Sequence, residues 1–141
     1  MIFPHYLLPE TKLLLVYIAK AKYNIQENIS WCKNGDYAGA TIHENKTFFI
    51  CTNTILKGDN ANSYLNETVN HEAVHAIHGC IGLRPLGIPL AMMPLPPRKI
   101  ADINRSIALT KHEWMRRQEH EAFWLEDKPK LILKYMKHFC F

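Results

Sequence analysis

Two histidines separated by one helical turn constrain the fold more than any other feature of the chain. His71 and His75 lie in the stretch 63–79, which contains no proline and ends on its single glycine, Gly79. Residues four apart occupy the same face of a helix. The opposite face carries small or apolar side chains, which are Leu65, Val69, Ala73 and Ala76. We therefore predict a helix over 63–79 with an apolar side facing the core and a histidine side with another purpose.

The residue between these histidines indicates what that purpose is. Residues 71–75 have the pattern His-Glu-x-x-His, in which two imidazoles one turn apart can reach one Zn²⁺. Glu72 points about a quarter-turn away, where it can serve as a general base rather than a ligand. This is the arrangement found in zinc metalloproteases. We predict His71 and His75 as metal ligands and Glu72 as the base, and the alternative is a solvated polar face.

Two other positions were considered for the metal. His78 follows His71 by two turns, and three positions on one straight helix rarely converge on a tetrahedral ion. We expect His78 to line the cleft or to support the ligands. The metzincin pattern places a third histidine where this chain has Ile81, so that pattern is excluded.

The third ligand is expected from a later segment. The stretch 107–125 has neither proline nor glycine and predicts one helix. Glu119 lies within its apolar stripe, where a carboxylate is costly unless it has a partner such as a metal. We predict Glu119 as the third ligand. The alternative ligands are Glu121, Glu126, His120 and His112. The alternative without a metal is an ion pair between Glu119 and Lys111, Arg116 or Arg117.

These motifs resemble known families. The run Glu119-x-Glu121-Ala122, some tens of residues after the histidine motif, resembles the second motif of small gluzincins, whose first glutamate is a ligand. Many of those enzymes have an acidic residue where this chain has Phe123. Residues 48–53 and 68–80 are also similar to the mitochondrial metallopeptidase family that processes an ATP synthase subunit. The resemblance implies a zincin fold that binds Zn²⁺ and acts on a peptide.

The chain length fits one domain over residues 1–141. We expect an α+β, minimal zincin-like domain, in which a small, mainly antiparallel sheet packs on the active-site helix and C-terminal helices carry the third ligand. The predicted elements besides those above are a helix over 10–23, strands over 29–33, 37–43 and 47–52, and a last helix with lysines on its outer face. One strand edge is expected to align the substrate, as in zincins.

A proline-rich segment separates the two predicted metal-binding helices. Residues 84–97 contain five prolines, which forbid a helix and disfavour a central strand. We expect a long apolar loop near the cleft that serves as a lid, a pocket wall or a partner surface, or that packs over the core.

The remaining expectations concern cysteines, charge and location. The four cysteines, Cys32, Cys51, Cys80 and Cys140, show no paired motif. We predict buried reduced thiols, with disulfides as the alternative. The chain shows no secretory signal and no transmembrane run, so we expect a cytoplasmic protein. A net charge of +4 from dispersed basic residues makes nucleic acid an improbable partner.

The function predicted from these residues is a zinc-dependent metallopeptidase acting on a protein or peptide. The candidates for stabilising the oxyanion are His78, His112, His120 and Tyr64. One alternative is a non-hydrolytic zinc-binding protein of zincin fold that acts as a regulator or assembly factor. Another is a binding module whose functional surface is the proline-rich segment.

Overall fold

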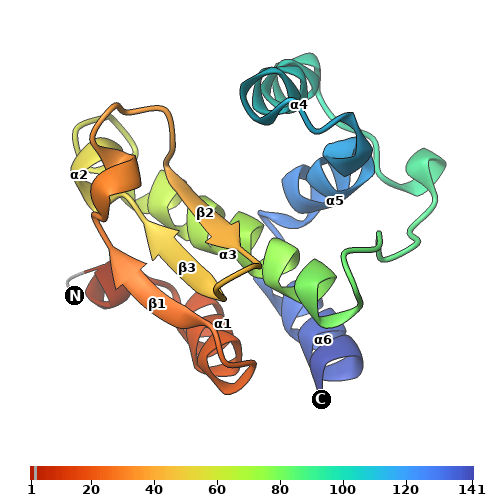
Figure 1. Ribbon diagram of the computed structural model, residues 1–141, viewed down its shortest axis with the longest axis horizontal. Coiled ribbons are helices and arrows are strands. Elements are labelled where there is room, and N and C mark those ends of the chain that lie inside the picture. The colour runs from red at the N-terminus through yellow and green to blue at the C-terminus, as the bar shows by residue number, and fades with distance from the viewer. Residues whose placement is uncertain (2) are drawn as a thin grey trace.

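The computed structural model describes Met1 and residues 3–141. Within these residues six α-helices accompany one three-stranded sheet, which confirms the α+β class (Figure 1). The helices are α1 (Pro9–Lys20), α2 (Thr52–Ile55), α3 (Ala61–Cys80), α4 (Pro97–Thr110), α5 (Arg116–Leu125) and α6 (Pro129–Cys140). The strands are β1 (Asn24–Glu27), β2 (Gly39–Ile42) and β3 (Thr47–Ile50).

The sheet is mixed, so the prediction of a mainly antiparallel sheet is wrong. The strand order is β1-β3-β2, with β3 parallel to β1 and antiparallel to β2. All four residues of β3 are buried, as its β-branched and aromatic composition predicts. The strand predicted over 29–33 does not form, because Asn28 adopts a positive φ of 54° and residues Ser30–Cys32 make a 3₁₀ turn. The first strand instead forms earlier, at Asn24–Glu27.

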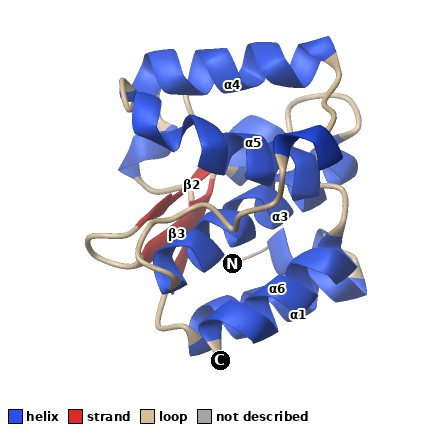
Figure 2. Cartoon of the chain, turned by 90° about the vertical axis from the view of Figure 1, so that its right-hand side faces the viewer, coloured by secondary structure: helices blue, strands red, loops and turns tan. Residues whose placement is uncertain are grey.

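Helix α3 lies between the sheet and the C-terminal helices and contacts most of the other elements. It packs against α1, α5, α6 and β2, and Figures 1 and 2 show it in the middle of the molecule. The predicted helix over 63–79 is confirmed with slightly longer bounds. Its apolar side is fully buried, as expected, but His75 and His78 are also buried. The histidine side therefore faces other protein groups rather than bulk solvent.

The single helix predicted over 107–125 is wrong, because α4 ends at Thr110 and α5 begins at Arg116. Lys111 adopts a positive φ of 61° and closes α4 through its N–H bond to the Ile107 carbonyl. The Thr110 hydroxyl also accepts a hydrogen bond from His112 N–H. This break folds α4 back onto α5, and in Figure 2 α4 forms the outermost layer above α5.

The proline-rich segment packs over the core. Apart from one 3₁₀ turn at Leu90–Met92, it has no regular structure. Its Met93 side chain is fully buried and Ile88 is nearly so. None of the residues that line the cleft described below comes from this segment. The segment therefore does not form a wall of the cleft, and two of its side chains pack on the core. Leu90 and Met92 are exposed, so the expected role as a partner surface stays a prediction.

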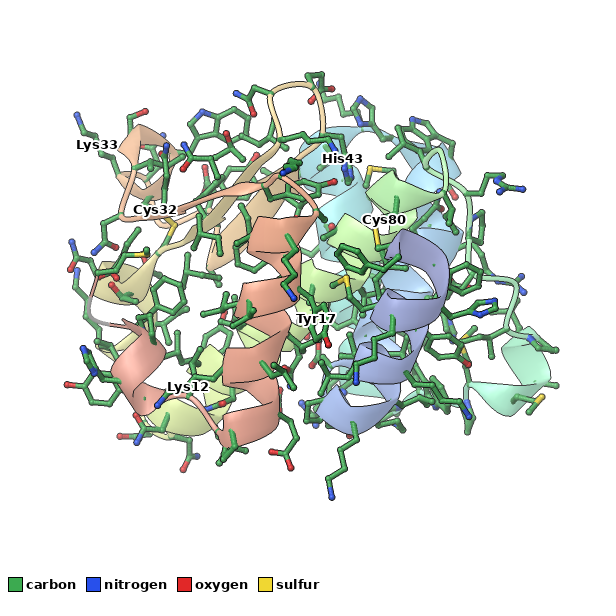
Figure 3. All side chains as sticks on the ribbon, turned by 90° about the horizontal axis from the view of Figure 1, so that it is seen from below. Lys12, Tyr17, Cys32, Lys33, His43 and Cys80 are labelled. Carbon is green, nitrogen blue, oxygen red and sulfur yellow. A yellow bond between two sulfur atoms is a disulfide. The ribbon has the colours of Figure 1, made fainter. Side chains whose placement is uncertain are left out.

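Two disulfides replace the reduced thiols that we predicted. Cys32 pairs with Cys51, and Cys80 at the end of α3 pairs with Cys140 at the end of α6. Figure 3 labels Cys32 and Cys80 and draws their sulfur atoms in yellow. The second pair spans 60 residues and depends on the packing of α3 against α6, which no local sequence pattern reveals. No helix in the described part of the chain is long and apolar enough to cross a membrane.

Candidate metal centre

Helices α3 and α5 bring together two histidines and one glutamate, which we call the cluster. His71 and His75 project from α3, and Glu119 projects from the first turn of α5. Their ligand-type atoms all lie within 4.8 Å of one another. The Nε2 atom of His71 is 3.3 Å from Glu119 Oε1, and the Nε2 atom of His75 is in close contact with the same oxygen. The three residues predicted as ligands are thus the three that the fold assembles.

Each of these side chains is held by a further contact, which for His75 is the one between its Nδ1 and His78 Nδ1. His71 Nδ1 lies 2.9 Å from Glu126 Oε1, so an N–H at Nδ1 leaves the Nε2 lone pair directed at the cluster. The Ser106 hydroxyl of α4 donates to the second carboxylate oxygen of Glu119. Two imidazoles and a carboxylate, each oriented from behind in this way, fit the donor set of a divalent metal such as zinc.

The electrostatics of the cluster agree with a cation site. Burial alone would lower the pKa of His71, but hydrogen bonds with Glu119 and Glu126 outweigh burial and raise that pKa well above its ordinary value. Burial alone would raise the pKa of Glu119, but the charge of His75 and hydrogen bonds from both histidines hold it well below its ordinary value. Without a metal the cluster therefore keeps a proton beside an anionic carboxylate. A divalent cation would replace that proton.

Glu72 faces the same cleft from the next position of α3. Its side chain is mostly buried, and the Thr41 hydroxyl of β2 lies 3.1 Å from Glu72 Oε1 and 3.0 Å from the Glu72 carbonyl oxygen. The contact ties the edge strand of the sheet to the helix that carries the histidines. Glu72 is thereby held beside the cluster without being one of its three members.

A cleft runs over this cluster between the sheet and α4. On one side it is lined by residues 36–39, which lead into β2, and on the other side by α4 residues that include Ser106. Its floor includes His71, Glu72 and Glu119. The cluster is therefore open to the cleft through His71 and Glu119.

Comparison with known proteins places the chain in a family without giving an activity. Residues 3–141 match a family model described as a domain of unknown function, DUF8637. The chain belongs to this family. No curated protein and no solved structure matches the chain. The chemistry of this family member must therefore be argued from its own residues.

Three of the four alternative ligands, Glu121, His120 and His112, lie away from the cluster. Glu121 is fully buried on the other side of α5, where it bonds to His78 and to the backbone of the proline-rich segment. His120 Nε2 is 2.8 Å from the Met93 carbonyl oxygen. His112 is exposed and stacks on Trp114. The proposed ion pair of Glu119 with a basic neighbour is also absent from the described interactions, in which Glu119 bonds to histidines and a serine.

Glu126, for which the sequence predicts either a metal ligand or a residue that supports a ligand, has the supporting role. It bonds to His71 from behind, and its other oxygen lies 3.4 Å from the buried Lys99 ammonium group. Phe123, which stands where related motifs carry an acid, packs edge-on against the His71 ring with centroids 4.5 Å apart. Glu126 therefore supplies from the next turn the carboxylate that Phe123 does not.

Sequence reasoning missed Thr41, Ser106 and Lys99. These residues come from the edge strand and from α4, and their places depend on how the sheet and α4 pack against α3 and α5. No spacing rule connects them with the histidine motif. The one available signal was a polar residue, Ser106, on the inner side of α4. This residue points to the site only when α4 is known to fold back onto α5.

Proposed function

We propose that the protein is a zinc-dependent metallopeptidase. The observation that carries this proposal is the convergence of His71 Nε2, His75 Nε2 and a Glu119 carboxylate oxygen, with ligand atoms within 4.8 Å of one another. Glu72 lies in the same cleft, on the helix that supplies both histidines. Two histidines and one glutamate with a free base beside them match the donor set of hydrolytic zinc enzymes rather than that of closed structural sites.

The roles of the residues follow from their positions. A zinc ion held by His71, His75 and Glu119 would supply a Lewis acid that polarises a carbonyl oxygen and makes water more acidic. Glu72 would accept a proton from the attacking water and pass it to the leaving amine. The Thr41 hydroxyl orients the Glu72 carboxylate. Glu126 keeps the His71 ring in the tautomer that binds a cation.

A peptide could bind along the edge strand. Strand β2 is at the edge of the sheet, and Gly39 at its start lines the cleft. A peptide added as a further strand would gain backbone hydrogen bonds and would pass over Glu72. Of the four candidates for stabilising an oxyanion, Tyr64 is the one that lines the cleft. Burial raises the pKa of its hydroxyl, which favours the protonated form needed to donate a hydrogen bond.

The substitution Glu72→Gln tests this proposal. The purified protein and the variant would be analysed for bound zinc and then incubated with a synthetic peptide library, with cleavage read by mass spectrometry. We expect one zinc per chain in both proteins, cleavage by the wild type, and a loss of roughly 10²- to 10⁴-fold in the variant. Glu113→Gln, an exposed change paired with Arg116, is the matched control and should cleave normally.

Two outcomes separate the alternatives. Zinc in both proteins with cleavage by neither would support the non-hydrolytic regulator or assembly factor and overturn the peptidase. A wild type that binds no zinc would overturn both. Glu119→Gln provides an independent check on the ligand set, because a neutral amide in place of the carboxylate should weaken zinc binding by at least about 100-fold.

A further inference from the structure

A buried chain of hydrogen bonds connects His75 with the proline-rich segment. His75 Nδ1, the nitrogen that faces away from Glu119, lies 3.4 Å from His78 Nδ1. His78 Nε2 lies 2.8 Å from Glu121 Oε1. The same oxygen accepts a hydrogen bond of 2.8 Å from Leu86 N–H, and Glu121 Oε2 accepts one of 3.1 Å from Gly87 N–H.

Neither the proposed metal centre nor contact with solvent accounts for this buried chain of hydrogen bonds. The residue exposure of His78 is 1% and that of Glu121 is 0%. Burying an ionisable side chain is costly unless its polar atoms are all satisfied. Neither residue is in contact with Glu119 or lines the cleft, so the proposed hydrolysis does not use either one directly.

The direction of each hydrogen bond can be assigned from the donors present. The two backbone N–H groups commit both Glu121 oxygens as acceptors, so His78 Nε2 must donate. A neutral imidazole with its proton on Nε2 has a lone pair on Nδ1. That lone pair faces His75 Nδ1, which must then donate in turn. The His75 proton is thereby held on Nδ1, and its Nε2 lone pair remains directed at the cluster.

We propose that His78 and Glu121 are positioning residues that fix the tautomer and ring orientation of His75 for metal binding. They also connect the metal centre to the proline-rich segment. This inference rests on the proposed function, since it takes His71, His75 and Glu119 to be the metal ligands. Two glutamates of α5 then have different roles. Glu119 binds the metal, and Glu121 supports His75 through His78.

Several hydrogen bonds fix the backbone that donates to Glu121 at the end of this hydrogen-bond chain. Besides Glu121, three other side chains of α5 hold the backbone of the proline-rich segment or of Leu83, which precedes it. Gln118 donates to the Leu83 carbonyl, Arg117 donates to the Ile88 carbonyl, and His120 bonds to the Met93 carbonyl. The Leu86 and Gly87 N–H groups are therefore held in place by the same helix that carries Glu121. A fixed pair of donors is what commits the Glu121 carboxylate to accepting.

The tautomers can be read directly in the wild-type protein. Long-range ¹H–¹⁵N correlation spectra of histidine side chains distinguish a ring protonated at Nδ1 from one protonated at Nε2. In the zinc-loaded protein we expect His78 to be neutral with its proton on Nε2, and His75 to carry its proton on Nδ1. A His78 ring protonated on Nδ1 would overturn the inference. This measurement requires no variant.

Two substitutions of His78 test its effect on the metal. Asparagine retains an acceptor oxygen near the position of Nδ1, whereas phenylalanine keeps the ring shape and removes both polar atoms. In competition with a zinc chelator, His78→Phe should bind zinc roughly 10- to 100-fold more weakly than the wild type. His78→Asn should restore most of that affinity.

The comparison separates positioning from a merely structural role. Both variants lose the bond to Glu121 and both should lower thermal stability, so a purely structural residue would give equal zinc affinities in the two. Equal affinities, or a wild-type affinity in His78→Phe, would overturn the inference. If the wild type itself binds no zinc, the proposed function fails instead. If the phenylalanine variant does not fold, the wild-type spectra decide.

Discussion

The disulfide between Cys80 and Cys140 should supply a large part of the stability of this protein. Cys80 is the last residue of the helix that carries both histidines, and Cys140 is the last residue of the final helix. The bridge closes a loop with a sequence separation of 60 residues. In the unfolded chain, such a closure removes many conformations that the native state never used. Removing the bridge therefore raises the entropy of the unfolded state.

The size of the effect follows from the length of the loop. With a separation of 60 residues, the chain-entropy relation gives about 4 kcal/mol at 25 °C. The separation of 19 residues between Cys32 and Cys51 gives about 3 kcal/mol by the same relation. Because a domain is typically stable by about 5–15 kcal/mol, the loss of the longer bridge would leave little margin.

The assay is urea unfolding of Cys80→Ala, Cys140→Ala and the double variant, in excess chelator so that metal binding does not contribute. All three proteins lack the same bridge and should lose the same free energy of unfolding, about 4 kcal/mol. Thiol alkylation of the denatured, unreduced wild type should find no free thiol. A double variant that loses less than about 1 kcal/mol, or a wild type with reactive thiols, would refute the reasoning.

Two further predictions concern charge in the interior. Lys99→Met should lower the free energy of unfolding by about 3 kcal/mol, since it leaves the Glu126 carboxylate without its buried cation. The control Lys130→Met, at an exposed site, should change it by less than about 0.5 kcal/mol in urea unfolding, and equal losses would contradict the argument. Burial and the neighbouring His75 lower the pKa of His43 to about 4. The unfolded chain therefore binds more protons, and stability should fall as the pH drops from about 6.5 to about 4. His43→Gln should make this decrease in the free energy of unfolding smaller. A variant with the same pH profile as the wild type in chemical denaturation would contradict the prediction.

Part of the candidate site could be predicted because it depends on local geometry. The spacing of His71 and His75 fixes their common face once a helix forms, and the apolar periodicity of 63–79 predicts that helix. Glu119 could be selected because a carboxylate in an apolar stripe requires a partner. The fold then brought it to the two histidines. These inferences need only the periodicity of a helix and the cost of burying charge.

The neighbours of the cluster could not be predicted in this way. The break at Lys111 involves neither glycine nor proline, so the sequence pattern ran through it as one helix. Ser106 reaches Glu119 because of that break. Helical periodicity places Glu126 almost in line with Glu119 and directs Glu121 elsewhere, but it does not show that Glu126 orients His71 and that Glu121 supports His78. The side of α5 on which each lies relative to α3 decided between them.

The sequence by itself therefore determined the helix that presents two imidazoles, the glutamate beside them and the acidic residue that meets them. The tertiary structure alone decided the mixed sheet, the disulfide pairs and the partners behind each ligand. The physical reason is the separation along the sequence over which each effect acts. Helical periodicity and burial cost act over a few residues, whereas a contact between residues that are tens of positions apart exists only after the layers have packed.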